Sequence, residues 1–397
     1  MPISSDLRTA PGALGRRSVP ETLGDALRRT LSGSRALSGS RSLSGNGTLS
    51  GSGISGRASG RFLGRALFQM SGPVRPGRAE AFGVLAGVAL DALLADPRRG
   101  HPVALFGRAA TALERRLYGD ARPAGIRYVA ACVGPVALLG LAAARTPDPR
   151  VRGALAAAAT WAVLGGTTLG REGAAMAGLL ESGDLAGARR RLPHLCGRDP
   201  SRLEESGLAR ATVESIAENT SDAVVAPLFW GAVAGIPGLL AYRAVNTLDA
   251  MVGHRDARYE RFGWAAARLD DVANYVPARI TGLLTVLAAP LAGGSVRRAA
   301  AVLRRDGHRH PSPNAGRCEA AFAGALDLTL GGVNVYGERV EHRPEMGDGA
   351  KPSVADIRRS VRLARTMNLA AAGLAAAALL ARRTGPGKGR PASRAAG

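Results

Sequence analysis

Six stretches of the chain consist almost entirely of apolar residues. Each is close to the ~17–25 residues that a helix needs to cross a bilayer. In chain order, the stretches are 79–95, 128–144, 153–170, 223–242, 280–296 and 366–381. A large soluble helical protein with buried alanine-rich helices is the alternative, but uncharged runs repeated this often favour a membrane protein. The pattern therefore predicts an all-α fold, a polytopic helical membrane bundle.

Helix-breaking residues between and within these stretches affect the expected topology. Pro147-Asp148-Pro149 turns the second and third stretches into a helical hairpin. If every stretch crosses, the polar loop 245–271 lies on the opposite side from the other polar loops. The fourth stretch contains Pro227 and Gly235-Ile-Pro-Gly238, which interrupt a spanning helix. A re-entrant or broken helix there gathers all the polar loops on one face, and this is the arrangement we expect.

The two ends of the chain have a different composition. Residues 1–75 are rich in Ser, Gly and Arg, with Leu-Ser-Gly repeated, and they cannot bury enough apolar surface to fold. We expect a disordered extension over 1–75, a membrane domain over 79–382 and a disordered basic tail over 383–397. Met70 lies just before the apolar part, so the start codon is either Met1 or Met70.

Charge narrows the possible partners. The chain has 53 Lys and Arg against 31 Asp and Glu, a formal net charge of +22. Such a balance suits nucleic acid, anionic lipid or phosphorylated substrates. The sequence contains no recognisable nucleic-acid-binding motif, so we expect no nucleic-acid partner. It also lacks a Walker-type phosphate loop, which excludes a P-loop ATPase. Three widely spaced cysteines give neither a disulfide framework nor a CxxC zinc motif.

The densest polar segment, 214–222, directly precedes the fourth apolar stretch. A spacing of four residues puts Glu214, Glu218 and Asp222 on one helical face, where like charges repel unless a cation compensates them. Carboxylates beside the amide of Asn219 are ligands that Mg²⁺ accepts while it keeps waters and bridges phosphates. The alternative is a solvated helix face that pairs with Arg210.

Further polar groups lie at the ends of other stretches. Asp91 instead lies inside the first one, and an ionisable group in a membrane segment is a functional candidate by default. The alternative is a hydrated aspartate near the membrane interface. Asp270-Asp271 form an adjacent acidic pair. Segment 304–314 is rich in phosphate-type donors, although contact with anionic lipid is the alternative. Together, these clusters indicate a phosphorylated or nucleotide substrate handled at the bilayer surface.

Several motifs occur in an order that resembles the CobD/CbiB family. They include Asp91-Ala-Leu-Leu-Ala-Asp96-Pro97 with His101-Pro102-Val103, Ser215-Ile-Ala-Glu-Asn-Thr-Ser-Asp222, Ala244-Val-Asn-Thr-Leu-Asp249-Ala-Met251, Phe262-Gly-Trp-Ala-Ala-Ala-Arg-Leu-Asp-Asp271, and His310-Pro-Ser-Pro-Asn314-Ala-Gly316 with Glu319. The resemblance covers about residues 83–365, and long motifs in a fixed order are a specific signal.

The resemblance implies a step of cobalamin biosynthesis. Family members join adenosylcobyric acid to (R)-1-aminopropan-2-ol or its O-phosphate, with ATP and Mg²⁺, to give adenosylcobinamide or its phosphate. The implied partners are the corrinoid, the amine, membrane lipid and, as candidates, other enzymes of the corrin pathway. The implied location is the cell membrane, as a multi-pass protein with a cytoplasmic active face. A non-catalytic transporter or scaffold of the same pathway is the alternative.

The expected residue roles follow from this resemblance. Mg²⁺ is assigned to Glu218, Asp222, Asp270 and Asp271. Nucleotide and phosphate contacts are assigned to Asn219, Arg268, Arg279, His310 and Asn314. The expected catalytic residues are His101 as a base toward the amine, Asp249 as partner of its ammonium group, and Glu218, Asp222 and Arg268.

Overall fold

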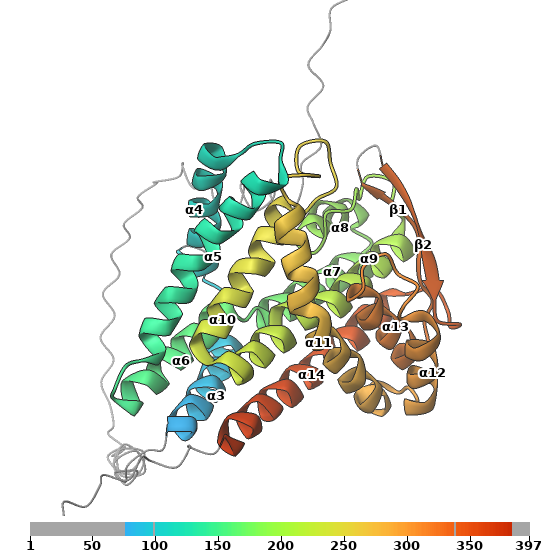
Figure 1. Cartoon of the computed structure of the whole chain (residues 1–397). Helices are drawn as coiled ribbons and strands as arrows, with labels where there is room; N and C mark the ends of the chain where they lie inside the picture. Colours follow the sequence, from blue (N-terminus) through green and yellow to red (C-terminus); the bar gives the residue numbers. More distant parts are fainter. Residues whose placement is uncertain (1–75, 98–99, 337–338, 383–397) are drawn as a thin grey trace, which may run out of the picture.

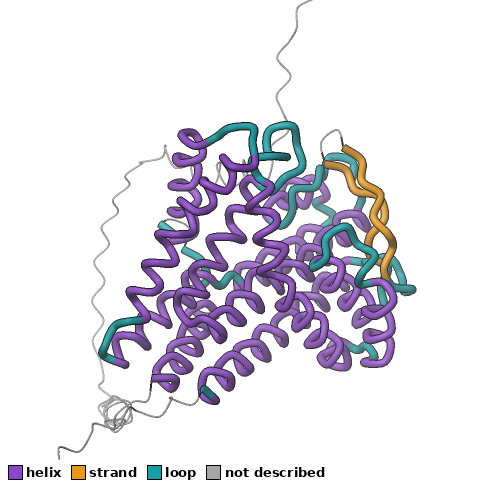
Figure 2. The backbone as a smooth tube through the Cα atoms, viewed as in Figure 1, coloured by secondary structure: helices purple, strands orange, loops and turns teal. Residues whose placement is uncertain are grey.

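The computed structural model describes residues 76–97, 100–336 and 339–382, and the predicted extension and basic tail lie outside them. The described part is a helical bundle with one small sheet (Figures 1 and 2). Its helices are α3 (Pro76–Leu94), α4 (Pro102–Leu117), α5 (Arg122–Ala144), α6 (Pro149–Val163), α7 (Gly166–Glu181), α8 (Leu185–Arg191), α9 (Glu205–Thr220), α10 (Ala226–Val252), α11 (Trp264–Ala288), α12 (Val296–Asp306), α13 (Ala315–Leu326) and α14 (Val354–Ala381).

Within the part of the chain that the structure describes, five helical stretches are long and apolar enough to cross a membrane. They are Arg122–Ala144, Pro149–Glu181, Glu205–Val252, Trp264–Ala292 and Val354–Ala381. Helix α3, which forms from the first predicted stretch, is not among them, because it contains Arg78, Glu80 and Asp91. Large apolar side chains on α5, α11 and α14 are exposed, which suits contact with lipid acyl chains. The predicted polytopic helical membrane bundle is confirmed.

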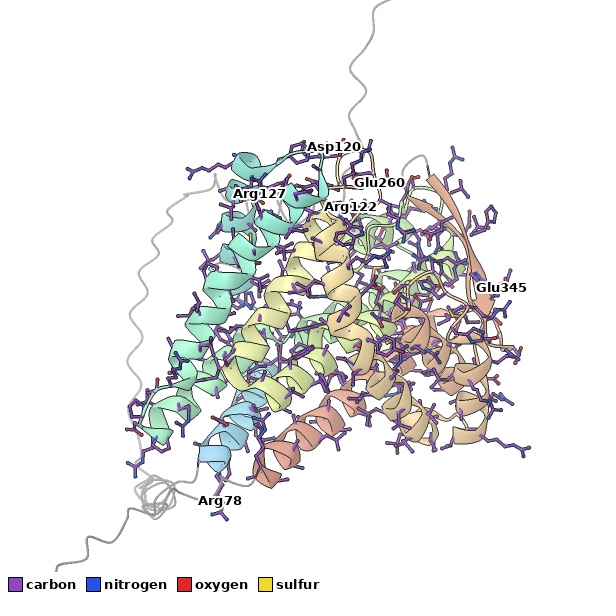
Figure 3. The ribbon with its side chains drawn as sticks, in the orientation of Figure 1. Arg78, Asp120, Arg122, Arg127, Glu260 and Glu345 are labelled. Carbon is purple, nitrogen blue, oxygen red and sulfur yellow. The ribbon has the colours of Figure 1, made fainter. Side chains whose placement is uncertain are left out.

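Charged side chains lie at both ends of the bundle, and we call the upper end in Figure 1, toward α8, α9 and the sheet, its polar end. In Figure 1, α3, α5, α6 and α14 extend toward the lower left, whereas α8, α9, α12, α13 and the sheet form the opposite side. Among the labelled charged side chains, Arg78 lies at the lower end, and Asp120, Arg122 and Glu260 lie at the upper end (Figure 3). Charged side chains therefore lie above and below a zone in which apolar helices predominate.

Helix α10 folds back on itself and does not continue straight. Gly235 has φ 68° and ψ −151°, a conformation outside any helix, and Pro237 follows it. The hydroxyl of Tyr242 donates to the backbone carbonyl of Asp222 at 3.3 Å. In a straight helix, residues 20 apart would lie roughly 30 Å from each other. The predicted broken helix is therefore a hairpin that returns the chain to the side from which it came.

A glycine is required at the turn of this hairpin. Positive φ with ψ near −150° is a region that only glycine populates freely, so we expect Gly235→Ala to destabilise the protein by about 1–3 kcal/mol. Thermal unfolding in detergent measures the loss. The matched control is Gly134→Ala in α5, where an added Cβ meets no atom within 4 Å. Equal melting temperatures for the two variants would contradict this account.

The third predicted stretch also differs from a single helix. Helix α6 ends at Val163 and α7 begins at Gly166, so the chain unwinds between them. In this break, the backbone N–H of Gly165 donates to the carbonyl of Ala223 at 3.2 Å. Ala223 belongs to a π-helical turn, Ser221–Val225, between α9 and α10. Two interrupted segments of the membrane region therefore lie against each other.

The small sheet is attached to α9. Strands β1 (Leu330–Tyr336) and β2 (Arg339–Met346) pair antiparallel, with Gly332 opposite Arg343. Arg210 of α9 donates to the carbonyl of Gly331, to that of Val333 at 2.7 Å and to the side chain of Asn334 at 3.2 Å. The sequence had not predicted this hairpin, which brings β2 toward the polar end of the bundle.

Candidate functional site

A cavity of about 240 Å³ opens at the polar end, and the segments that line it are far apart in the chain. It lies among α9, the π-helical turn, the second half of α10, α13, strand β2 and the loop before α9. Its charged lining residues are Arg198, Glu214, Glu218, Asp222, Asp249, Glu319 and Arg343. Five carboxylates therefore face the same space as two guanidinium groups.

The carboxylate of Glu214 is already engaged within the protein. It accepts from Arg198 Nη2 at 2.6 Å and from the backbone N–H of Gly331 at 2.8 Å. Arg210 lies further away, with its Nε 3.9 Å from a Glu214 oxygen. The side chains of Arg198 and Glu214 are each only 4% exposed. Glu214 thus joins α9 to the preceding loop and to β1, which is a structural task.

Glu218 and Asp222 are the acidic residues of the predicted face that remain for chemistry. Both line the cavity, together with Asn219. The side-chain N–H group of Asn219 donates to the backbone carbonyl of Ser215 at 2.9 Å, which fixes the orientation of its amide. Asp222 lies within the π-helical turn, a distortion often found at functional sites. The predicted clustering of these three residues is present in the structure.

The hairpin in α10 brings a further carboxylate and an amide to the cavity. Asp249 and Asn246 line it from the returning half of α10. Asp270 of α11 lies behind them, where it accepts from Asn246 at 3.3 Å and from Asn274 at 3.0 Å. Without the reversal at Gly235, these residues would lie far from α9.

Other predicted residues lie away from the cavity lining. Arg268 is largely exposed, with its Nη1 3.4 Å from Asp271. The guanidinium of Arg279 stacks 3.3 Å from the centroid of the Tyr275 ring. Asn314 donates to the backbone carbonyl of Asp271 at 2.8 Å. Their assigned roles stay predictions, and the adjacent residues Asp270 and Asp271 have separate partners.

His101 also lies outside this lining. It immediately precedes α4 and caps its N-terminus, where its Nδ1 accepts from the backbone N–H of Val103 at 3.3 Å. Its Nε2 lies 3.4 Å from a carboxylate oxygen of Asp96. The expected role of His101 as a base toward the amine therefore stays a prediction.

Besides Glu214, three charged residues of the cavity were not predicted as site residues. Arg198 precedes α9, Glu319 lies in α13 and Arg343 lies in β2. Glu319 is buried, and desolvation together with the nearby Glu214 and Glu218 carboxylates raises its pKa well above the usual range. The high charge density of segment Glu341-His-Arg343-Pro-Glu345 is visible in the sequence. The spacing of these residues does not indicate which side chains they contact in the fold.

His310 packs against this end of the cavity. Its Nε2 lies 3.9 Å from Glu319, and its Nδ1 accepts from the backbone N–H of Ser312 at 3.0 Å. Burial and the positive charge of Arg343 lower the pKa of His310 from 6.5 to about 4. The folded protein therefore keeps this imidazole neutral at physiological pH.

This shift predicts a pH-dependent stability. Between pH 6.5 and 4 the unfolded chain binds a proton at His310 that the folded protein does not, so folding weakens as the pH falls through this range. At pH 5 we expect a loss of about 2 kcal/mol relative to pH 7. Melting temperatures of the wild type and of His310→Gln, compared at both pH values, isolate this contribution. An equal acid-induced loss in both proteins would exclude His310 as its source.

The donor set of the cavity can be compared with the needs of Mg²⁺. Within the described ranges, no three His, Cys, Asp or Glu side chains converge closely enough to form a complete metal site. Mg²⁺ rarely uses such a cage, since it binds through one or two carboxylates, waters and substrate phosphates. The oxygen donors of Glu218 and Asp222 therefore fit Mg²⁺ held together with a phosphate ligand.

Fold and site together define a multi-pass helical membrane protein with a buried acidic cavity at the polar end of its bundle. Comparison with known proteins narrows this class. The family model described as CobD/Cbib protein matches residues 84–364. The chain thus belongs to the CobD/CbiB family, as its motifs predicted. It is a protein of cobalamin biosynthesis.

Curated relatives agree over most of their length. The chain is 56% identical to the cobalamin biosynthesis protein CobD of Mycobacterium tuberculosis, over 77% of this chain and 98% of the relative. The proteins of the same name from Geobacter metallireducens and Rhodobacter capsulatus are 46% and 44% identical. Each match covers 68% of this chain, and 87% and 86% of the respective relative. No solved structure matches the chain.

Proposed function

We propose that this protein is an ATP-dependent ligase that joins the carboxylate of adenosylcobyric acid to (R)-1-aminopropan-2-ol or its O-phosphate. Family membership supports the pathway. The observation that carries the chemistry is the cavity, in which carboxylates and arginines from distant segments face one space. An amide bond does not form readily from a carboxylate and an ammonium ion in water. The site must therefore activate the carboxylate and deprotonate the ammonium ion.

The cavity offers separate groups for cation and phosphate. We assign Mg²⁺ to Glu218 and Asp222, with Asp270 beside them. When bound, Mg²⁺–ATP supplies the phosphoryl group that activates the corrinoid carboxylate. Arg343 faces the cavity from β2, with its guanidinium 3.8 Å from Glu319 and 3.7 Å from Glu341. Because Arg198 is engaged by Glu214, Arg343 is the arginine that we assign to orient a phosphate.

Proton transfer from the amine requires an acceptor within the protein. Asp249 lies in the cavity wall and is assigned to the substrate ammonium. Glu319 is a second carboxyl of the cavity that we assign to proton exchange with the amine, and burial beside Glu214 and Glu218 raises its pKa. Held close to the activated carboxyl carbon, the neutral amine attacks, the carbon–nitrogen bond forms and the phosphate leaves.

We further propose that the protein resides in the cell membrane with the cavity on the cytoplasmic side. The five apolar helical stretches support the membrane location. ATP and the phosphorylated amine are soluble, charged molecules, so a cavity at the polar end of the bundle suits their access. The corrinoid, also large and polar, would reach the cavity from the same side.

A turnover assay tests this function. Detergent-purified protein is incubated with adenosylcobyric acid, Mg²⁺–ATP and each amine in parallel, and the products are identified by mass spectrometry. Product from one amine but not the other supports the ligase and identifies the substrate. If the protein binds the corrinoid but forms no product with either amine, a transporter or scaffold becomes the better account.

A further inference from the structure

A chain of side-chain hydrogen bonds runs between α10 and α11, behind the cavity wall. It consists of Asp270, Asn274 and Tyr242, and we call it the Asp270 network. Asp270 Oδ2 accepts from the side-chain N–H of Asn274 at 3.0 Å, and the side-chain oxygen of Asn274 accepts from the Tyr242 hydroxyl at 2.8 Å. Asn274 and Tyr242 are 2% and 3% exposed, so these bonds are shielded from competing water.

The network reaches the cavity wall at both of its ends. At one end, the Tyr242 hydroxyl lies 3.3 Å from the backbone carbonyl oxygen of Asp222, which lines the cavity from the π-helical turn. At the other end, Asp270 Oδ1 accepts at 3.3 Å from the side chain of Asn246, which lines the cavity from the returning half of α10. Both oxygens of Asp270 thus accept from amide groups, and Asp270 itself is not part of the lining.

The orientation of the Asn246 amide is determined from two sides. Its nitrogen donates to Asp270, and its oxygen accepts from Arg243 Nη1 at 3.4 Å. The reverse orientation would place the amide oxygen against the Asp270 carboxylate and the amide N–H group against the guanidinium, which is unfavourable on both sides. An amide nitrogen has two N–H donors, and Asp270 uses one of them. The second is the donor that Asn246 can offer to a ligand in the cavity.

A phosphate group is the ligand that this donor suits. An ammonium ion has only donors and is matched by the carboxylate of Asp249, whereas phosphate oxygens are strong acceptors. The network also joins Asn246 to the turn that carries Asp222, one of the two residues assigned to Mg²⁺. Asn246 and the assigned metal ligands therefore face one space from segments that the network holds together.

We propose that Asn246 donates a hydrogen bond to a phosphate of the bound Mg²⁺–nucleotide, and that the Asp270 network is a positioning device for its amide. Asp270 acts through Asn246 and makes no contact with the metal ion. This inference rests on the proposed ATP-dependent function. It adds a neutral phosphate-binding residue to that function and gives Asp270 a task that requires a hydrogen-bond acceptor at this position, not a negative charge.

Nucleotide binding tests the inference without requiring turnover. The affinity of the detergent-purified protein for Mg²⁺–AMP-PNP, a non-hydrolysable ATP analogue, is measured by calorimetry. Asn246→Leu has a similar size but no donor, and we expect it to weaken binding about tenfold. Asp270→Asn should give a loss of similar size, because two amide N–H groups then compete for one orientation. Asp120→Asn, an exposed aspartate elsewhere, is the matched control and should bind like the wild type.

An exchange of the two side chains separates position from charge. Asp270→Asn/Asn274→Asp keeps the net charge and every hydrogen bond of the network. The new amide at position 270 accepts from Asn246 and donates to the new carboxylate at position 274, which also accepts from Tyr242. The exchange moves the negative charge by one helical turn, about 6 Å. We expect it to restore the affinity for Mg²⁺–AMP-PNP to within about twofold of the wild type.

Weak binding by the exchange variant would overturn the inference, since the charge at position 270 would then be needed, as for a metal ligand. Wild-type affinity in Asn246→Leu would overturn it as well. If Asp270→Asn fails to fold, the exchange variant compared with the wild type decides alone. In turnover assays, KM for ATP should rise in Asn246→Leu while KM for the corrinoid and the amine stays unchanged. Restored nucleotide binding with no turnover in the wild type would leave the inference standing and reject the ligase. Turnover by the wild type with no restoration would do the reverse, and a wild type that binds no nucleotide would reject both.

Discussion

Replacing Glu218 and Asp222 together by Gln and Asn is expected to lower turnover at least ~10³-fold, while the protein still inserts and folds. These two carboxylates face the cavity, whereas Glu214 on the same face is neutralised by Arg198. The amides keep the size of the side chains and remove the negative charge that holds a divalent cation. The turnover assay with saturating Mg²⁺–ATP measures the loss.

The matched controls carry the same chemical change on the surface. Asp120 and Glu260 lie at the polar end of the bundle but not in the cavity (Figure 3). Asp120→Asn/Glu260→Gln is expected to retain wild-type activity. A fully active Glu218→Gln/Asp222→Asn protein would reject the metal assignment. A partial loss that higher Mg²⁺ concentration restores would instead support it.

The second large effect concerns stability. Arg198→Met leaves the carboxylate of Glu214 buried without its nearest cation, and breaking one half of such a pair costs roughly 3–5 kcal/mol. Because Glu214 also accepts from Gly331, the loss should loosen the attachment of the β1–β2 hairpin as well. Thermal unfolding in detergent is expected to show a clearly lower melting temperature.

A double variant distinguishes charge from packing. Arg198→Met/Glu214→Gln removes both charges and keeps a side-chain oxygen that can accept from Gly331. It should recover much of the stability lost in the single variant, because no uncompensated charge remains buried. If Arg198→Met alone melts like the wild type, the pair contributes little to stability. If the double variant is as unstable as the single one, lost packing is the cause.

The sequence was informative wherever the signal was local. Apolar stretches predicted the helices, Gly235 and Pro237 predicted the reversal in α10, and a spacing of four residues predicted that Glu214, Glu218 and Asp222 share a face. Each of these depends on neighbouring residues only. For that reason the bundle and the acidic half of the cavity could be anticipated.

Long-range partners could not be read in the same way. The contact of Glu214 with Gly331 joins residues 117 apart, and Arg343 reaches the cavity only because the β1–β2 hairpin is attached to α9. Helical periodicity carries no information about such pairings. The same limit applies to Arg268 and Arg279, to which phosphate binding was assigned. In the fold, Arg268 contacts Asp271, and Arg279 donates to the backbone carbonyl of Tyr275 and stacks on its ring.

Because of the reversal at Gly235, a count of membrane crossings based on hydropathy overestimates the number for this chain. A segment that enters and leaves on one side contributes no net crossing, although its length and composition match those of a spanning helix. Reporter enzymes fused after residue 204 and after residue 256 should therefore register the same compartment. A cysteine placed at the tip of the hairpin should resist labelling by membrane-impermeant reagents added from either side.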